Sequence, residues 1–597
     1  MSVALRATNL PGWMQGRASA ARSTLGWRAY LVLALISLAF YLPGQSRLPP
    51  VDRDESRYAQ ATSQMLQTHN FVDVRYQDQP RYLQPVGIYW LQSLSVSVFS
   101  TPTAKQIWAY RVPSLISACA AVLLTAWIGA MLFGAEAGFA AALLLAMSML
   151  LNFESHMAKI DATLLATTLT AQGALLRAYL ADIAVPRKGR GRWNAALFWA
   201  ALGVGLLLKG PIILIVSGTT IAAVCAQDRK IAWLKRLHAG WGVFVMLAVA
   251  LPWFVAIGIK THGAFFAKAV GQNLMGKLGR GEQAHGSFAG YYLALFPVTF
   301  WPGSMVAGFA LPWTWRNRLT PQVRFLLAWI VPTWLIYEMI ATKLPHYALP
   351  YYPAVACLAA GAALSADGWT FGRVGKVFAS IWAVIWLAVG VAGAGFGAFL
   401  IWRFEHRVDS IAVAAAVVAI LLIAATLVFV VRKDLRFAVI TGGGAALIIF
   451  AGLTAYSLPV VPTLWLSPRI TAAVARAAPC PTTVLASSGF SEPSLVFLNG
   501  GSPMLVNVKK TADHLVRDPA CGLSLVAKRQ LPKFMAEMAA NHMAATPVGE
   551  VSGINYSWGR WLDLTLFRAG PMTGPPVPIP PDPPKSDRGP VNPYAQP

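Results

Sequence analysis

Long apolar runs dominate this sequence and restrict its fold more than any other feature. A helix that crosses a bilayer needs about 20 mostly apolar residues, and about thirteen runs approach that length. Only 12% of the residues are charged, about half the share in an ordinary soluble domain. These features exclude a soluble enzyme and a disordered chain, and they predict a polytopic α-helical membrane protein. The runs are 28–45, 108–133, 137–152, 160–181, 193–208, 210–227, 240–258, 289–310, 322–341, 346–364, 376–402, 410–431 and 437–457.

Basic residues occupy alternate connections between these runs. The chain has 49 Lys and Arg against 24 Asp and Glu, a formal net charge of +25. Membrane proteins gather Lys and Arg in their cytoplasmic loops, so this alternation explains much of the excess. We expect residues 1–27 to be cytoplasmic and the C-terminal region to lie on the other side. The chain has no nucleic-acid motif, and we expect no nucleic-acid partner.

The runs divide the chain into a membrane domain and a polar C-terminal region. We assign residues 28–457 to the first, with 46–107 as a long outer loop, and residues 458–570 to a periplasmic α/β domain. Residues 571–597 are Pro-rich, which is typical of a disordered tail. Cys480 and Cys521 lie in the polar domain, and an oxidising compartment would let them form a disulfide. The polar domain is expected to have strands at 482–486, 494–498, 523–528 and 562–567, and helices at 511–516 and 531–540.

Acidic side chains stand at two outer boundaries of the membrane domain. Asp54 and Glu55 open a stretch that is amphipathic as far as Met65 if a helix begins there. The positive end of that helix would favour their ionised forms. Asp161 begins the fourth run. Either site could also be a simple helix cap, a position that Asp favours.

Bases and histidines accompany these acids on the outer side. Lys209-Gly210-Pro211 breaks an apolar stretch, and Lys343-Leu344-Pro345-His346-Tyr347 lies between two runs. His285 lies in a third outer segment. A carboxylate can take a proton from an acceptor, and cations can stabilise a phosphate leaving group. The combination predicts a site for a phosphate-bearing lipid.

The order of these elements resembles a known family. Residues 53–60, 80–92, 209–211, 343–353 and 492–497 are similar to motifs of the lipid A aminoarabinose transferases. They are also similar to the motifs of relatives in glycosyltransferase family 39, including protein O-mannosyltransferases. These are GT-C membrane enzymes that use polyprenyl-phosphate sugars at the outer face of the bacterial inner membrane.

The resemblance implies roles for residues at matching positions. Asp54 would act as the base or orient the acceptor, and Glu55 and Asp161 would support the reaction centre. The reaction would invert the anomeric carbon, with polyprenyl phosphate leaving and lipid A or another envelope glycan as acceptor. The donor phosphate would contact Arg57, Arg81, Lys209 and Lys343, and the site would also contain Tyr58, His285, His346 and Tyr347.

Two positions depart from the family pattern. Leu83 replaces an acidic residue that can help to hold a metal ion in the aminoarabinose transferases, and leucine cannot ligate a metal. We therefore expect no metal or other cofactor. Gln84 replaces a phosphate-binding lysine, for which Arg81 or Arg75 could compensate. The alternatives are a protein O-glycosyltransferase, a lipid-linked sugar transporter or flippase, and an altered or inactive paralogue.

Overall fold

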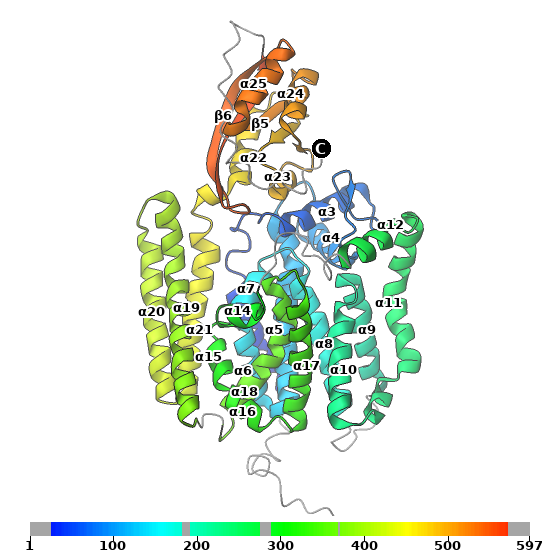
Figure 1. Ribbon diagram of the computed structural model, residues 1–597, viewed down its shortest axis with the longest axis vertical. Coiled ribbons are helices and arrows are strands. Elements are labelled where there is room, and N and C mark those ends of the chain that lie inside the picture. The colour runs from blue at the N-terminus through cyan, green and yellow to red at the C-terminus, as the bar shows by residue number, and fades with distance from the viewer. Residues whose placement is uncertain (1–24, 182–190, 275–287, 368–370, 571–597) are drawn as a thin grey trace, which may run out of the picture.

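The protein consists of a large bundle of helices with a smaller α/β domain beyond one end (Figure 1). This computed structural model describes residues 25–181, 191–274, 288–367 and 371–570. The principal bundle helices are α2 (Trp27–Tyr41), α5 (Ile107–Phe133), α6 (Ala135–Ala146), α7 (Met149–Ser155), α8 (Asp161–Leu180), α9 (Gly191–Lys209), α10 (Ile212–Asp228), α11 (Ala239–Lys260), α14 (Tyr291–Thr299), α15 (Ser304–Phe309), α16 (Leu311–Arg316), α17 (Pro321–Met339), α18 (Tyr352–Ala363), α19 (Arg373–Glu405), α20 (Ser410–Val431) and α21 (Leu435–Gly452).

Each predicted apolar run contains helix, although several runs are short or broken. Among the described residues, six helices are long and apolar enough to cross a membrane, or up to seven if a bent pair is one span. The bent pair is α6 with α7, which meet at 64°. The chain is therefore a multi-pass membrane protein, and the count of thirteen spans stays a prediction.

Breaks in the helices place polar residues near one end of the bundle. The α7 helix ends at Ser155, and α8 begins at Asp161 after a short loop. At the α9–α10 junction, Gly210 has a φ of +64°, a backbone conformation that glycine adopts without a side-chain clash. This turn ends α9 at Lys209 and leaves the lysine at the helix terminus.

The first outer loop folds against the same end of the bundle. It contains α3 (Asp54–Thr68), β1 (Arg75–Tyr76), β2 (Gln79–Pro80) and α4 (Gly87–Phe99). The amphipathic helix predicted from Asp54 is confirmed. Its apolar face buries Tyr58, Ala61 and Met65 against Ile88 and Tyr89 of α4, which fixes how the first turn of α3 faces the bundle.

The C-terminal domain is built on one five-stranded sheet in the order β4-β3-β5-β7-β6. The parallel strands are β3 (Leu485–Ser488), β4 (Met504–Leu505) and β5 (Leu523–Ala527), and β7 (Arg560–Gly570) pairs antiparallel with both β5 and β6 (Ala544–Asn555). Helices α22 (Leu466–Ala477), α24 (Val508–Arg517) and α25 (Leu531–Ala540) pack on it. The predicted α/β character and the Cys480–Cys521 disulfide are confirmed.

One predicted strand of this domain is wrong. Residues 494–498 belong to the short helix α23 (Pro493–Leu498). Pro493 occupies the first helical turn, where its fixed φ favours a helix and its missing N–H leaves no bond unmade. A short apolar run does not by itself separate strand from helix.

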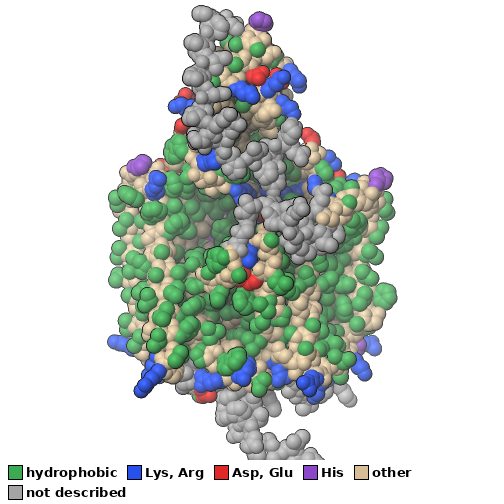
Figure 2. Space-filling view, viewed as in Figure 1, with side chains coloured by type: hydrophobic (Ala, Val, Ile, Leu, Met, Phe, Trp, Pro, Cys, Tyr) green, Lys and Arg blue, Asp and Glu red, His purple; other side chains and the backbone are tan. Residues whose placement is uncertain are grey.

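Basic side chains gather at the end of the bundle away from the C-terminal domain, as Figure 2 shows. The apolar sides between the two ends match the surface that lipid would cover. The predicted clustering of basic residues at one membrane boundary agrees with this distribution. Which side of the membrane each end faces stays a prediction.

Candidate active site

Asp54 is the first residue of α3, at the end of the bundle beneath the C-terminal domain. Its side chain is 54% exposed, and its carboxylate lies 4.0 Å from Nη1 of Arg57. Partial burial opposes ionisation, but the positive charges of Lys159, Arg81 and Arg57 outweigh it and lower the pKa of Asp54. The structure therefore presents an ionised, accessible carboxylate. Asp54 and Asp161 are the first helical residues of α3 and α8, and the N-cap positions are held by Arg53 and Ile160.

Arg81 is held beside Asp54 by two tyrosines. Its Nε donates a hydrogen bond of 2.9 Å to the Tyr89 hydroxyl. Its guanidinium lies 5.0 Å from the ring centre of Tyr58, which stacks at an angle on Tyr89. A guanidinium over an aromatic face is stabilised by the ring's electron density. The predicted residues Tyr58 and Arg81 thus form a single unit beside Asp54.

A chain of ion pairs continues from this unit into the bundle. Nζ of Lys209 is 2.5 Å from Oδ1 of Asp161, and Nζ of Lys159 is 3.8 Å from Oδ2 of Asp161. Lys159 also donates to Oε1 of Glu154 at 3.0 Å. All four side chains are almost fully buried. Asp161 begins α8, where the helix dipole further favours its ionised form.

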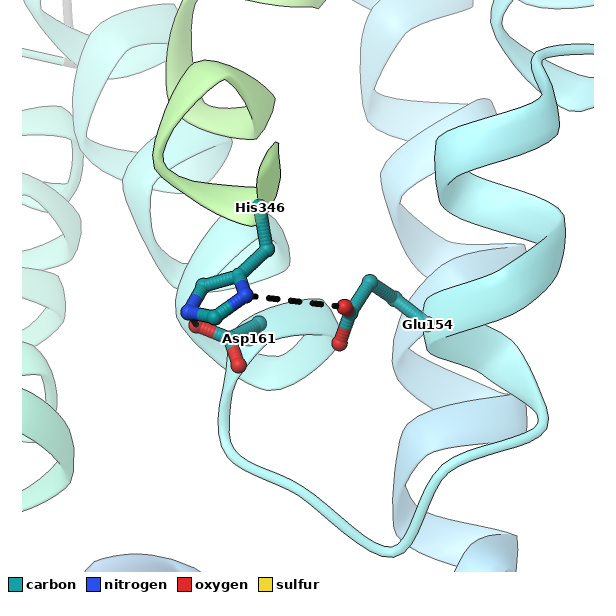
Figure 3. Close-up of side chains that lie close together, drawn as sticks. All are labelled: Glu154, Asp161 and His346. Atoms are coloured by element: carbon teal, nitrogen blue, oxygen red, sulfur yellow. Dashed lines mark ion pairs between the residues drawn. The ribbon is translucent and has the colours of Figure 1, made fainter. Parts of the chain in front are cut away.

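His346 lies between the two buried carboxylates (Figure 3). Its Nδ1 is 3.9 Å from Glu154, and its Nε2 is 3.8 Å from Asp161. Its ring packs edge-on against Tyr347, over which Lys209 lies at 5.4 Å. The predicted residues Asp161, Lys209, His346 and Tyr347 therefore come together.

Glu154, Asp161 and His346 are close enough to hold a metal ion, as one atom from each lies within 4.8 Å of the others. However, the two nitrogens of His346 face different carboxylates. The lysine ammonium groups already lie 3.0 and 2.5 Å from the carboxylate oxygens. This geometry fits an ion-pair network better than a metal centre, and the prediction of a metal-independent site remains untested.

Glu55 has a different environment from Asp54. Its side chain is fully buried, and its two oxygens accept hydrogen bonds of 2.8 Å from Nε and Nη2 of Arg111. They also accept from the backbone N–H groups of Val51 and Ala158. With four donors and no exposed surface, Glu55 is a structural clamp that fixes the start of α3 to α5 and to the α7–α8 loop.

Lys343 has different neighbours from the other predicted cations. Nζ of Lys343 lies 3.6 Å from Glu338 and donates to the backbone oxygen of Phe288, so it belongs to a neighbouring contact. His285 lies outside the described residues. Arg75, the first residue of β1, pairs with Asp73. Of the two arginines expected to compensate for Gln84, Arg81 is therefore the one that lies beside Asp54.

The sequence pattern did not single out three residues that the structure adds to the site. Glu154 and Lys159 belong to the ion-pair cluster, and Arg111 holds Glu55 in place. One available signal was the scarcity of acids. Glu154 interrupts an apolar run only seven positions before Asp161 in a chain with 24 acidic residues. The pairing of Arg111 with Glu55 joins residues 56 positions apart, so it could be found only from the folded chain.

The charge count of the cluster favours an anionic ligand. The cluster contains three carboxyl groups, those of Asp54, Glu154 and Asp161, and four cationic side chains, those of Arg57, Arg81, Lys159 and Lys209. Cationic side chains outnumber the carboxyl groups, which suits a phosphate, a group that Arg and Lys both recognise. The exposed carboxylate of Asp54 lies next to these cationic side chains. The site can therefore bind a phosphate ester through the cations and accept a proton on the adjacent carboxylate.

The fold is the GT-C fold. It matches the crystal structure of ArnT from Cupriavidus metallidurans bound to undecaprenyl phosphate with a TM-score of 0.72 and 18% identity, covering 92% of this chain and 100% of that one. The apo form of the same protein matches with a TM-score of 0.70, 19% identity and coverages of 92% and 99%.

The chain is also similar in sequence to curated proteins. The chain is 28% identical over 330 residues, 54% of its length, to the undecaprenyl phosphate-α-4-amino-4-deoxy-L-arabinose arabinosyl transferase of Yersinia pestis. The Aeromonas salmonicida protein of that name is 26% identical over 379 residues, covering 60% of this chain and 66% of that one. The match spans 56% of the Yersinia protein. Residues 83–255 match the dolichyl-phosphate-mannose-protein mannosyltransferase family. The expected resemblance to ArnT-like GT-C proteins is confirmed.

Proposed function

We propose that this chain is an inverting glycosyltransferase that moves a sugar from a polyprenyl-phosphate donor to lipid A, other lipopolysaccharide or another envelope glycan. The observation that carries the proposal is the accessible Asp54 carboxylate beside Arg57 and Arg81. The fold supports it, and so do the names of the sequence relatives. The reaction would take place at the periplasmic face of the bacterial inner membrane, with the C-terminal domain in the periplasm.

The cations would bind the donor phosphate and match its charge as it leaves. An acceptor oxygen attacks the anomeric carbon from the side opposite the phosphate, and the bond from that carbon to the phosphate oxygen breaks. The polyprenyl phosphate departs with the electron pair, and its charge develops against Arg57, Arg81 and Lys209. This electrostatic match makes a covalent enzyme intermediate unnecessary.

Asp54 would act on the acceptor. When the acceptor is a hydroxyl group, its proton passes to the ionised carboxylate as the new bond forms. The lowered pKa of Asp54 keeps that carboxylate ready to accept the proton at neutral pH. Asp161 and Glu154 would hold Lys209 and Lys159 in place, since Asp161 pairs with both lysines and Glu154 pairs with Lys159.

A transfer assay with purified protein in detergent tests the proposal. Extracts that contain polyprenyl-phosphate sugars and envelope acceptors are incubated with wild type, Asp54→Asn or the control Asp563→Asn, an exposed Asp on β7. We expect transfer by wild type and Asp563→Asn, and at least a hundredfold loss in Asp54→Asn. Full activity in Asp54→Asn contradicts the assigned base. Sugar transfer to protein but not to glycan indicates a protein O-glycosyltransferase. If wild type transfers no sugar to any acceptor, the proposal of an enzyme is contradicted.

A further inference from the structure

The backbone immediately before Asp54 has an unusual conformation. Arg53 has φ 65° and ψ −111°, a region that glycine enters freely and other residues avoid. A non-glycine residue in such a region is strained and persists only where its surroundings hold it. Arg53 makes no side-chain cap to α3. The groups that hold this backbone therefore determine where the Asp54 carboxylate points.

The C-terminal domain supplies those groups. The Arg53 guanidinium donates a hydrogen bond of 2.5 Å to the backbone oxygen of Ser557 and lies 5.5 Å from the ring centre of Trp558. The N–H of Asp52 donates to the Tyr556 hydroxyl at 2.7 Å. Residues 556–558 form the turn between β6 and β7. Both residues before Asp54 are thus bound by one turn of another domain.

The N-terminus of α23 makes a second contact with the same segment. The Asp52 carboxylate accepts a hydrogen bond from the backbone N–H of Ser494 at 3.3 Å and another from the Ser494 hydroxyl. Helix α23 also packs along α3. On the opposite side, Glu55 is fixed to Arg111 and Ala158. Asp54 therefore lies between one anchor in the bundle and one in the C-terminal domain.

We infer that the C-terminal domain is part of the reaction centre's support, and that Tyr556, Ser494 and Arg53 are positioning residues that aim the Asp54 carboxylate at the acceptor. This inference rests on the proposed transferase function. Their side chains bond Asp52 and the turn between β6 and β7, so we expect them to act on the chemical step through Asp54, while Arg57, Arg81 and Lys209 bind the donor. Undocking of the turn would release the strained backbone and move the carboxylate.

Tyr556→Phe is the sharpest variant because it removes one hydroxyl and keeps the ring that packs on Trp465. Tyr456→Phe is the matched control, since Tyr456 bonds Asp409 elsewhere on the outer end of the bundle. We expect Tyr556→Phe to lower kcat roughly tenfold, as a small misplacement of a reacting group does. The KM for the lipid donor and the thermal unfolding midpoint should stay at wild-type values. Tyr456→Phe should leave kcat unchanged.

The pair Arg53→Ala and Arg53→Gly tests the role of the backbone. Both lose the contacts to the turn, but glycine adopts the native φ and ψ without strain and alanine does not. We expect Arg53→Gly to retain several times the kcat of Arg53→Ala. Equal activities in the two variants contradict a positioning role that acts through this backbone. Wild-type kcat in Tyr556→Phe combined with Ser494→Ala overturns the inference.

Hydrogen–deuterium exchange separates this inference from the proposed function. The double variant Tyr556→Phe/Ser494→Ala should exchange faster at the amides of residues 54–58 than wild type does. The amides of α8 should be unaffected. Faster exchange at the start of α3 together with an inactive wild type supports the coupling between domains and removes the transferase proposal. Unchanged exchange with an active wild type removes the coupling and leaves the transferase proposal intact.

Discussion

Glu55 is either a structural clamp or a catalytic acid, and breaking its pair with Arg111 distinguishes the two roles. Both side chains are fully buried, and the guanidinium also donates to the backbone oxygens of Gln45, Leu48 and Pro49. Glu55→Gln keeps the size of the side chain but leaves the Arg111 charge without its counter-ion. It also points an amide N–H₂ toward groups that are themselves donors. Breaking a buried pair in this way destabilises a protein by about 3–5 kcal/mol.

The assay is chemical unfolding of the purified protein in detergent, with Glu550→Gln as control. Glu550 is exposed on β6, and a surface change of this kind alters stability by no more than about 0.5 kcal/mol. We expect Glu55→Gln to lose at least about 3 kcal/mol of unfolding free energy. If Glu55→Gln unfolds like wild type and yet loses all transfer activity, the clamp is refuted and Glu55 is a catalytic residue.

Three further predictions follow from other contacts. Lys209→Gln should raise the KM for the lipid donor about tenfold or more, because a charge that pairs with phosphate is lost; an unchanged KM in steady-state kinetics argues against phosphate binding there. Replacing Cys480 and Cys521 by serine should destabilise the C-terminal domain by about 4 kcal/mol relative to oxidised wild type, from a closed loop of 41 residues, as measured by thermal unfolding; reduced wild type should unfold like the variant. Burial and the charge of Glu492 raise the pKa of Asp52 to about 7, above about 4 in the unfolded chain. The folded state then holds more protons between these values, so the stability contributed by Asp52 falls as pH rises from about 4 to 7. Asp52→Asn should flatten that part of the curve of unfolding midpoint against pH, and a parallel curve contradicts the assignment.

The sequence predicted the helical bundle well because apolar runs and helix breaks are local features. Asp161, Lys209 and His346 could be proposed together only from their order and outer position, yet the fold brings them within ion-pair distance. The partners of each residue could not be predicted in the same way. Glu55 follows Asp54 in the chain, yet Glu55 is buried against Arg111 and Asp54 is exposed.

The C-terminal domain shows where local patterns were insufficient. The helices predicted at 511–516 and 531–540 are confirmed as parts of α24 and α25. The helix at Pro493–Leu498 was missed, since a segment of six residues is too short to show a distinguishing period. Its contact with Asp52 depends on the docking of one domain against another, which no local pattern encodes.

Mass spectrometry of lipid A and core oligosaccharide tests the central claim most directly. A strain lacking the gene is compared with the same strain carrying wild type, Asp54→Asn or Asp563→Asn. The account predicts that one sugar disappears in the deletion strain and returns with wild type and Asp563→Asn but not with Asp54→Asn. Envelope glycans that are unchanged in the deletion strain, or fully restored by Asp54→Asn, would contradict it.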